Sequence, residues 1–172
     1  MLQVIKGRIV KPRRIVFHGV AGIGKGTWAA GAPSPICIQT EDGNDLTGVD
    51  RTPVRVTLAE VQQDLRSVLL DDHDYRTLMI DTLDNIDVLI QTAVAIGAGA
   101  DTVGEIDFGR GYLTALKEFR KILFMLDKIR DVRGMHIILI CHTKVTRFED
   151  PSTDAYDRYG LQMHAKTADE VM

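Results

Sequence analysis

The sequence predicts an α/β fold with a mostly parallel central β-sheet flanked by helices. Short apolar runs and longer helical stretches alternate along the whole chain, which is typical of strands joined by helical crossovers. The apolar run at residues 136–141 is continuous, as expected for a strand that is covered on both faces. With 172 residues, 45% of them hydrophobic, the chain can form the core of one domain.

The first half of the chain gives a strand, a glycine-rich turn, a helix and a second strand, in that order. The expected elements are strands at residues 15–17, 36–38 and 54–56 and helices at residues 25–30 and 58–69. The breaker Gly31-Ala32-Pro33 separates the first helix from the second strand. This order of elements predicts a parallel strand pair with its helix packed on the sheet.

The second half continues the alternation. The expected elements are strands at residues 77–80 and 136–141 and helices at residues 86–94, 112–129 and 168–172. Residues 97–111 are rich in glycine and poor in periodicity, which predicts a long, mobile loop. Residues 145–160 are polar and rich in turn-forming residues, which predicts a second loop.

Composition excludes several classes of protein. The formal net charge of -3 argues against a protein that coats nucleic acid through bulk charge alone. Cys37 and Cys141 lie in apolar runs without the spacing of a zinc site, so we expect two reduced core residues. No apolar run approaches the roughly 18 residues of a membrane span, and no signal peptide is evident, so we expect a cytoplasmic protein without a membrane partner.

A phosphate-binding loop is predicted between the first strand and the first helix. Backbone N–H groups freed by glycine wrap phosphates there, and the lysine adds a positive charge. The usual motif Gly-x-x-x-x-Gly-Lys continues with Ser or Thr, whose hydroxyl binds magnesium; here Gly26 takes that place and Thr27 follows. We therefore expect ATP with Mg²⁺ as ligands and slow hydrolysis. The expected nucleotide-binding residues are Gly19, Val20, Ala21, Gly22, Ile23, Gly24, Lys25, Gly26 and Thr27.

Polar residues follow three of the predicted strands. Asp81 ends one strand where a carboxylate can hold magnesium, together with Thr27. Glu41 follows another strand and is a candidate general base, with Asp42 the less favoured carboxylate. His142 follows the central strand, where it can contact a γ-phosphate or serve only as a structural histidine. Glu41, His142 and Lys25 are therefore the predicted catalytic residues.

The order of these motifs resembles the RecA-like ATPase core, and in particular the phage-encoded RecA/RadA-like P-loop ATPases of the single-strand annealing recombinase type. The likeness is carried by residues 19–27, 75–84, 109–112 and 138–159. It implies a single ATP-binding domain over residues 1–172 that lacks the last strands of the family's sheet. It also implies phosphate binding by Lys25 and Thr27, magnesium binding by Asp81, a catalytic base at Glu41 and a γ-phosphate sensor at His142.

The same resemblance implies DNA recombination or strand annealing on single-stranded DNA in the host cytoplasm, with DNA-stimulated hydrolysis by a homo-oligomer. The two loops would contact DNA, and Arg147 or Arg158 would reach a neighbour's phosphate as an arginine finger. Basic side chains would supply charge and aromatic ones stacking faces. The DNA-contact candidates are Arg110, Tyr112, Lys144, Arg147 and Arg158, with Phe148, Tyr156 and Tyr159 as further aromatic faces.

Two other functions are compatible with the motifs. The ending Gly24-Lys25-Gly26-Thr27 is also found in adenylate-kinase-like enzymes, so a small-molecule kinase is the first alternative. Its lid would need clustered arginines, whereas residues 145–160 mix acidic residues with their arginines. The second alternative is a binding module that uses ATP as a switch to assemble on DNA or a replication partner with little turnover.

Overall fold

The computed structural model describes residues 3, 7, 11–43, 48–149 and 154–172. Within them lies a six-stranded sheet in the order β1-β5-β4-β2-β3, with β6 paired to β5. The strands β1 to β5 run parallel, and β6 is antiparallel to the second half of β5. Their bounds are β1 Arg14–Gly19, β2 Pro35–Gln39, β3 Asp50–Arg51, β4 Thr77–Asp81, β5 His136–Phe148 and β6 Tyr156–Leu161.

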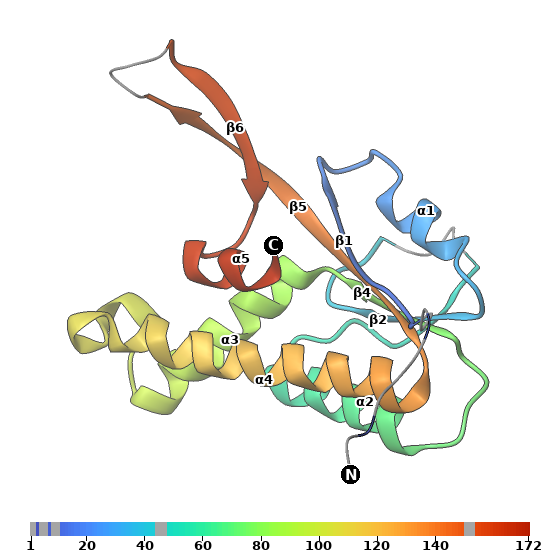
Figure 1. Cartoon of the computed structure of the whole chain (residues 1–172). Helices are drawn as coiled ribbons and strands as arrows, with labels where there is room; N and C mark the ends of the chain where they lie inside the picture. Colours follow the sequence, from blue (N-terminus) through green and yellow to red (C-terminus); the bar gives the residue numbers. More distant parts are fainter. Residues whose placement is uncertain (1–2, 4–6, 8–10, 44–47, 150–153) are drawn as a thin grey trace.

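Helices cover both faces of the sheet (Figure 1). The larger core cluster joins one face to α2, α3 and α4, and a smaller cluster joins the other face to α1. The helix bounds are α1 Lys25–Ala30, α2 Leu58–Leu70, α3 Leu83–Ala98, α4 Arg110–Arg133 and α5 Ala165–Val171. The predicted α/β fold with a mostly parallel central sheet is confirmed. In the part of the chain that the structure describes, no helix has the length and apolar character needed to cross a bilayer.

The short strand predicted at residues 54–56 is wrong; the third strand lies at Asp50–Arg51. The chain still runs beside β2, because the N–H groups of Thr52 and Arg55 donate to carbonyls of that strand at 2.9 Å. These two donors are three residues apart, whereas donors to one neighbour alternate every second residue in a regular parallel strand. The segment therefore follows β2, but residues 54–56 are out of the regular register and the paired strand ends at Arg51.

The long loop predicted at residues 97–111 is also wrong. The helix α3 continues to Ala98, the 3-10 turns Val103–Glu105 and Asp107–Gly109 follow, and α4 begins at Arg110. Gly99 and Gly109 adopt positive φ at helix boundaries, and a Cβ on Gly111 would overlap the carbonyl oxygen of Val103. These glycines end helices or allow a close backbone contact.

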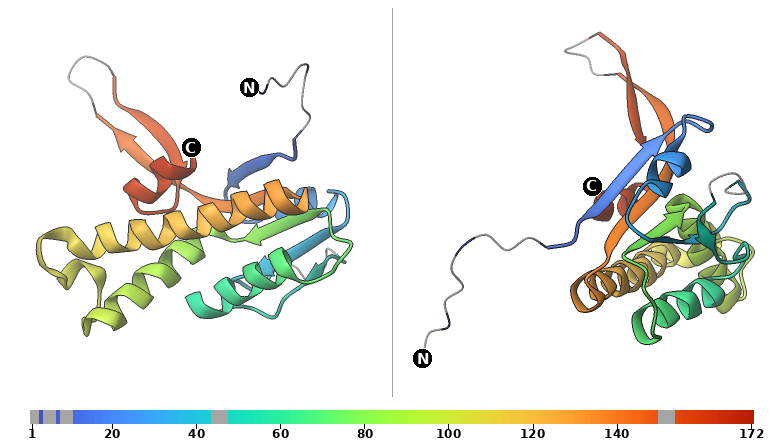
Figure 2. Two further views of the ribbon diagram at one scale, coloured as in Figure 1. Left: turned by 60° about the horizontal axis from the view of Figure 1, so that its bottom comes forward. Right: turned by 90° about the vertical axis from the view of Figure 1, so that its right-hand side faces the viewer.

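The loop predicted at residues 145–160 is a β-hairpin in the described residues. β5 extends from the core to Phe148, and β6 returns as far as Leu161 (Figure 2). Residues 150–153 of the predicted loop lie outside the described residues. The hairpin projects from the body of the protein, where side chains need not be apolar, so its charged residues concealed the strand pattern.

Both cysteines are buried and free, as predicted. Burial, reinforced by the carboxylate of Asp81, raises the pKa of Cys37 to about 12. Burial and the carboxylate of Asp84 raise the pKa of Cys141 to about 12 as well. The fraction of reactive thiolate at neutral pH is then about a thousandfold below that of an ordinary cysteine.

We therefore expect both thiols of the native protein to resist iodoacetamide at neutral pH and to react once the protein is denatured. Mass spectrometry of the alkylated chain, taken at intervals before and after addition of guanidinium, measures both rates. Modification of either thiol at the denatured rate in the native protein would contradict the burial described for that residue.

Candidate active site

The phosphate-binding loop predicted from the sequence lies between β1 and α1. Gly24 is the residue before α1 and adopts a φ of 92°, a conformation that favours glycine. Lys25 is only 7% exposed, and its ammonium donates to the carbonyl oxygens of Gly19 at 3.0 Å and Val20 at 3.1 Å. The cationic side chain of the first helical residue is thus held against the glycine turn that precedes α1.

The parallel sheet brings the predicted polar residues to the same edge, because the carboxyl ends of parallel strands coincide. In the register of the strands, His142 of β5 is paired with Gly19 of β1, and Asp81 of β4 with Gln39 of β2. Glu41 follows β2 by two residues. Four strands therefore contribute residues to a site beside α1.

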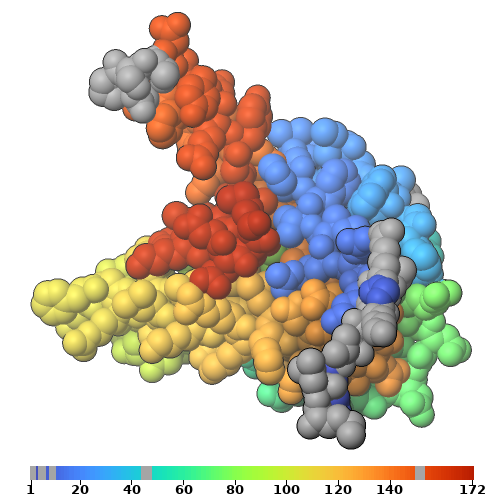
Figure 3. Space-filling view, in the orientation of Figure 1, coloured from blue at the N-terminus to red at the C-terminus, as the bar shows by residue number. Residues whose placement is uncertain are grey.

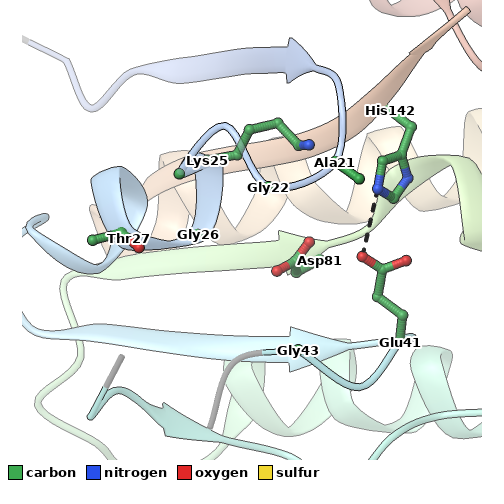
Figure 4. Close-up of a pocket in the computed structure, with 10 residues that line it drawn as sticks. Ala21, Gly22, Lys25, Gly26, Thr27, Glu41, Gly43, Asp81 and His142 are labelled. Carbon is green, nitrogen blue, oxygen red and sulfur yellow. Dashed lines mark ion pairs between the residues drawn. The ribbon is translucent and has the colours of Figure 1, made fainter. Parts of the chain in front are cut away.

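Glu41, Asp81 and His142 line a cavity of about 310 Å³ together with the glycine loop (Figure 4). Lys25 and Thr27 come from α1 and Asp81 from β4, and the side chains of Glu41 and His142 point toward each other. Of the predicted loop, Gly19, Val20 and Ile23 are not part of the lining. The lining residues are Ala21, Gly22, Gly24, Lys25, Gly26, Thr27, Glu41, Gly43, Asp81 and His142.

Glu41 and His142 form a contact inside this cavity. The Nε2 atom of His142 lies 3.7 Å from Oε1 of Glu41. Burial raises the pKa of Glu41, and the carboxylates of Asp81 and Asp84 raise it further, while His142 and Lys25 act in the opposite direction. A raised pKa makes this carboxylate a stronger base toward a water molecule at neutral pH.

Two further residues of the site, Asp84 and Asn85, were not assigned a role from the sequence. Asp84 accepts the backbone N–H of His142 at 3.0 Å and contacts its Nδ1 at 2.9 Å. Asn85 donates from Nδ2 to Oε2 of Glu41 at 3.2 Å and to the carbonyl of Thr40 at 3.4 Å. The sequence pattern that could have indicated them is a pair of adjacent polar residues in the first turn of the helix that follows Asp81.

The site has few residues that could hold a metal ion. Among the described residues, no group of three or more His, Cys, Asp and Glu side chains is arranged to hold one. Mg²⁺ in nucleotide sites is held by one or two protein side chains together with the substrate's phosphates. The hydroxyl of Thr27 and the carboxylate of Asp81, both in the lining, fit this requirement.

The five DNA-contact candidates lie outside the cavity lining. Arg110 and Tyr112 begin α4, and the ring of Tyr112 stacks on His164 with centroids 4.4 Å apart, so one of its faces is already covered. The ammonium of Lys144 donates to the carbonyl of Met163 at 3.0 Å. Arg147 and Arg158 are exposed on the hairpin.

The register of the hairpin separates its side chains onto two faces. Directly opposed residues share a face, and alternate pairs along the ribbon lie on opposite faces. One face carries the pairs Lys144↔Gly160, Thr146↔Arg158 and Phe148↔Tyr156; the other carries Thr143↔Leu161, Val145↔Tyr159 and Arg147↔Asp157. The first, which we call the cationic face, has basic and aromatic residues without an acid, whereas on the second Asp157 opposes Arg147.

The space-filling view shows the hairpin standing clear of the body, next to α5 (Figure 3). Its exposed aromatic residues include Tyr156 and Tyr159, at 51% and 65% exposure. Another exposed aromatic residue, Phe108, lies at the α3–α4 tip with 96% exposure and a φ of 53°, and the sequence offered no pattern that distinguished it.

Comparison with known proteins gives one family. A family model described as an AAA domain matches residues 11–172, which is most of the chain. No curated protein matches the chain.

Proposed function

Since this chain belongs to the AAA domain family of P-loop ATPases, we propose that it binds ATP with Mg²⁺, hydrolyses the ATP slowly and couples this cycle to single-stranded DNA. The observation that carries the proposal is the convergence on one cavity of Lys25, from the start of α1, with Glu41 and Asp81, from the ends of two strands. A cation, a magnesium-binding carboxylate and a base around a glycine loop are the groups that phosphoryl transfer to water requires.

The residues present fit a nucleoside triphosphate and its metal ion. The glycine loop offers backbone N–H groups, and the ammonium of Lys25, which now donates to two loop carbonyls, supplies a charge for the β- and γ-phosphates. Thr27 and Asp81 would hold Mg²⁺, which neutralises charge on the phosphates when it is bound.

The side chains of the cavity orient the attacking water molecule and accept its proton. Glu41, with its raised pKa, orients a water molecule and accepts its proton, and Asn85 holds the second carboxylate oxygen. His142 faces the same space from β5. Gly26 stands where P-loop ATPases have a hydroxyl residue, so we expect turnover to be slow.

The test is ATP hydrolysis by the purified chain with Mg²⁺, measured with and without single-stranded DNA. DNA-stimulated phosphate release supports the whole proposal. ATP binding with negligible release, accompanied by ATP-dependent assembly on DNA, would instead favour the switch-like binding module. Transfer of phosphate to a nucleoside monophosphate would favour the kinase. Gel filtration with and without ATP tests the proposed homo-oligomer.

The cationic face of the hairpin is our candidate for the DNA contact. Single strands are bound by basic side chains that follow the backbone and by aromatic rings on which bases stack. Arg158 and the Phe148–Tyr156 ring pair, with centroids 5.3 Å apart, are on this face. Arg147 is on the other face, opposite Asp157, and its Nε lies 3.6 Å from Glu149, so part of its charge is already neutralised.

We therefore expect Arg158→Glu to weaken binding of a labelled oligonucleotide by about tenfold and to reduce the salt dependence of binding. Arg147→Glu, the matched control on the opposite face, should weaken binding less than threefold. Fluorescence anisotropy at two salt concentrations measures both quantities. Equal losses for the two variants would contradict the assignment of the contact to the cationic face.

A further inference from the structure

The first turn of α3 contacts the side chains of both Glu41 and His142 at the cavity. Asp84 contacts His142, and the next residue, Asn85, contacts Glu41. Asp84 is 5% exposed and lies at the second position of the helix, where the positive end of the helix dipole stabilises an anion. The helix therefore presents a fixed acceptor to the histidine from the side opposite Glu41.

The two contacts of Asp84 with His142 indicate which ring nitrogen of the histidine carries hydrogen. A carboxylate is an acceptor only, and Oδ1 of Asp84 already receives the backbone N–H of His142. The contact of 2.9 Å between Oδ2 and Nδ1 is a hydrogen bond only if Nδ1 carries hydrogen. In the neutral imidazole, Nε2 then presents a lone pair toward the cavity and Glu41.

We propose that Asp84 is a positioning residue that holds His142 in the Nδ1–H tautomer and so keeps Nε2 from donating to Glu41. The Nε2 atom of His142 and the Oε1 atom of Glu41, 3.7 Å apart, are then both acceptors. His142 therefore donates no hydrogen bond to Oε1. Asn85 holds only Oε2, so Oε1 of Glu41 is left to accept a proton from water. This inference rests on the proposed function of the cavity and names the residue that keeps its base available.

The substitution Asp84→Asn shows whether Asp84 acts by fixing the tautomer of His142 or only by filling space beside it. The amide has almost the same shape, but only its oxygen can accept the backbone N–H of His142, so its NH₂ group faces Nδ1. Nδ1 must then accept, Nε2 carries the hydrogen, and Nε2–H can donate to Glu41. We expect kcat to fall by about a hundredfold while the Kd for ATP changes less than about twofold.

Asp87→Asn is the matched control. Asp87 lies on the same helix, is 1% exposed and also accepts a backbone N–H, that of His164 at 3.0 Å. It is not part of the cavity lining. We expect Asp87→Asn to leave the kcat of the protein within about threefold of the unmodified value. Thermal unfolding of both variants shows whether either substitution disturbs the fold.

The deciding readout is the pair of ring ¹⁵N chemical shifts of His142, assigned by their loss in His142→Gln. We expect a protonated Nδ1 and a bare Nε2 in the unmodified protein at neutral pH, and the reverse in Asp84→Asn. An Nε2–H tautomer or a doubly protonated ring in the unmodified protein would overturn the proposal, and so would an unchanged tautomer in a folded Asp84→Asn variant.

The spectrum of the unmodified protein needs neither turnover nor a variant, so it decides the tautomer even if Asp84→Asn does not fold. If the spectrum shows the Nδ1–H tautomer but the protein releases no phosphate, the proposed hydrolysis fails while the positioning by Asp84 stands. If hydrolysis occurs with the opposite tautomer, the proposed function stands and the role of Asp84 is lost.

Discussion

Replacement of Lys25 by alanine is expected to abolish detectable ATP binding and, with it, hydrolysis. The ammonium of Lys25 is the cationic group nearest the glycine loop in the cavity lining, and charge-assisted hydrogen bonds contribute about 1.5–3 kcal/mol each. Loss of two such bonds to phosphate oxygens weakens binding by about two to four powers of ten. Isothermal titration calorimetry with ATP and Mg²⁺ measures the Kd, and phosphate release measures turnover.

Lys117→Ala is the control for this experiment, since Lys117 is an exposed lysine on α4 that does not line the cavity. It should bind ATP as the unmodified protein does. Undiminished ATP affinity in Lys25→Ala would show that the nucleotide binds elsewhere, and the proposed function of the cavity would then be wrong.

The second large effect is expected from Glu41→Gln, which should retain ATP binding but lose hydrolysis by a factor of about 10²–10⁴. The amide keeps the size of the side chain and an oxygen that can accept from Nδ2 of Asn85. It cannot accept a proton from water at neutral pH. Single-turnover phosphate release, combined with the Kd for ATP, separates the loss of chemistry from a loss of binding.

The neighbouring carboxylate provides the comparison, because Asp42 is exposed and does not line the cavity. Asp42→Asn should hydrolyse ATP within about twofold of the unmodified rate, as expected for a surface substitution away from the site. If Asp42→Asn lost activity and Glu41→Gln kept it, the general base would have been assigned to the wrong residue.

The parts of the fold that the sequence predicted are those in which local pattern and burial agree. β4, which ends at Asp81, and the part of β5 that ends at Cys141 are buried, so their apolar runs are visible in the sequence. Because parallel strands share a carboxyl edge, the positions of Glu41, Asp81 and His142 after strands were sufficient to predict that these residues meet.

The remaining features depend on contacts that the sequence does not display. Asp84 meets His142 across 58 residues, and its role depends on the rotation of the first turn of α3 against β5. The sequence does not predict the hairpin because an exposed ribbon needs no apolar face, and the glycines at residues 97–111 resemble a loop because a sequence does not display φ angles.

The strand β5 belongs to the parallel sheet in its first half and to the projecting hairpin in its second half. It pairs with both β1 and β4 as far as Ile140 and with β1 as far as His142, and from Thr143 to Phe148 the strand paired with it among the described residues is β6. The free arm from Thr143 to Phe148 is about 20 Å long at roughly 3.3 Å per residue. A tilt of about 5° at His142, which lines the cavity, therefore displaces the end of this arm by about 2 Å.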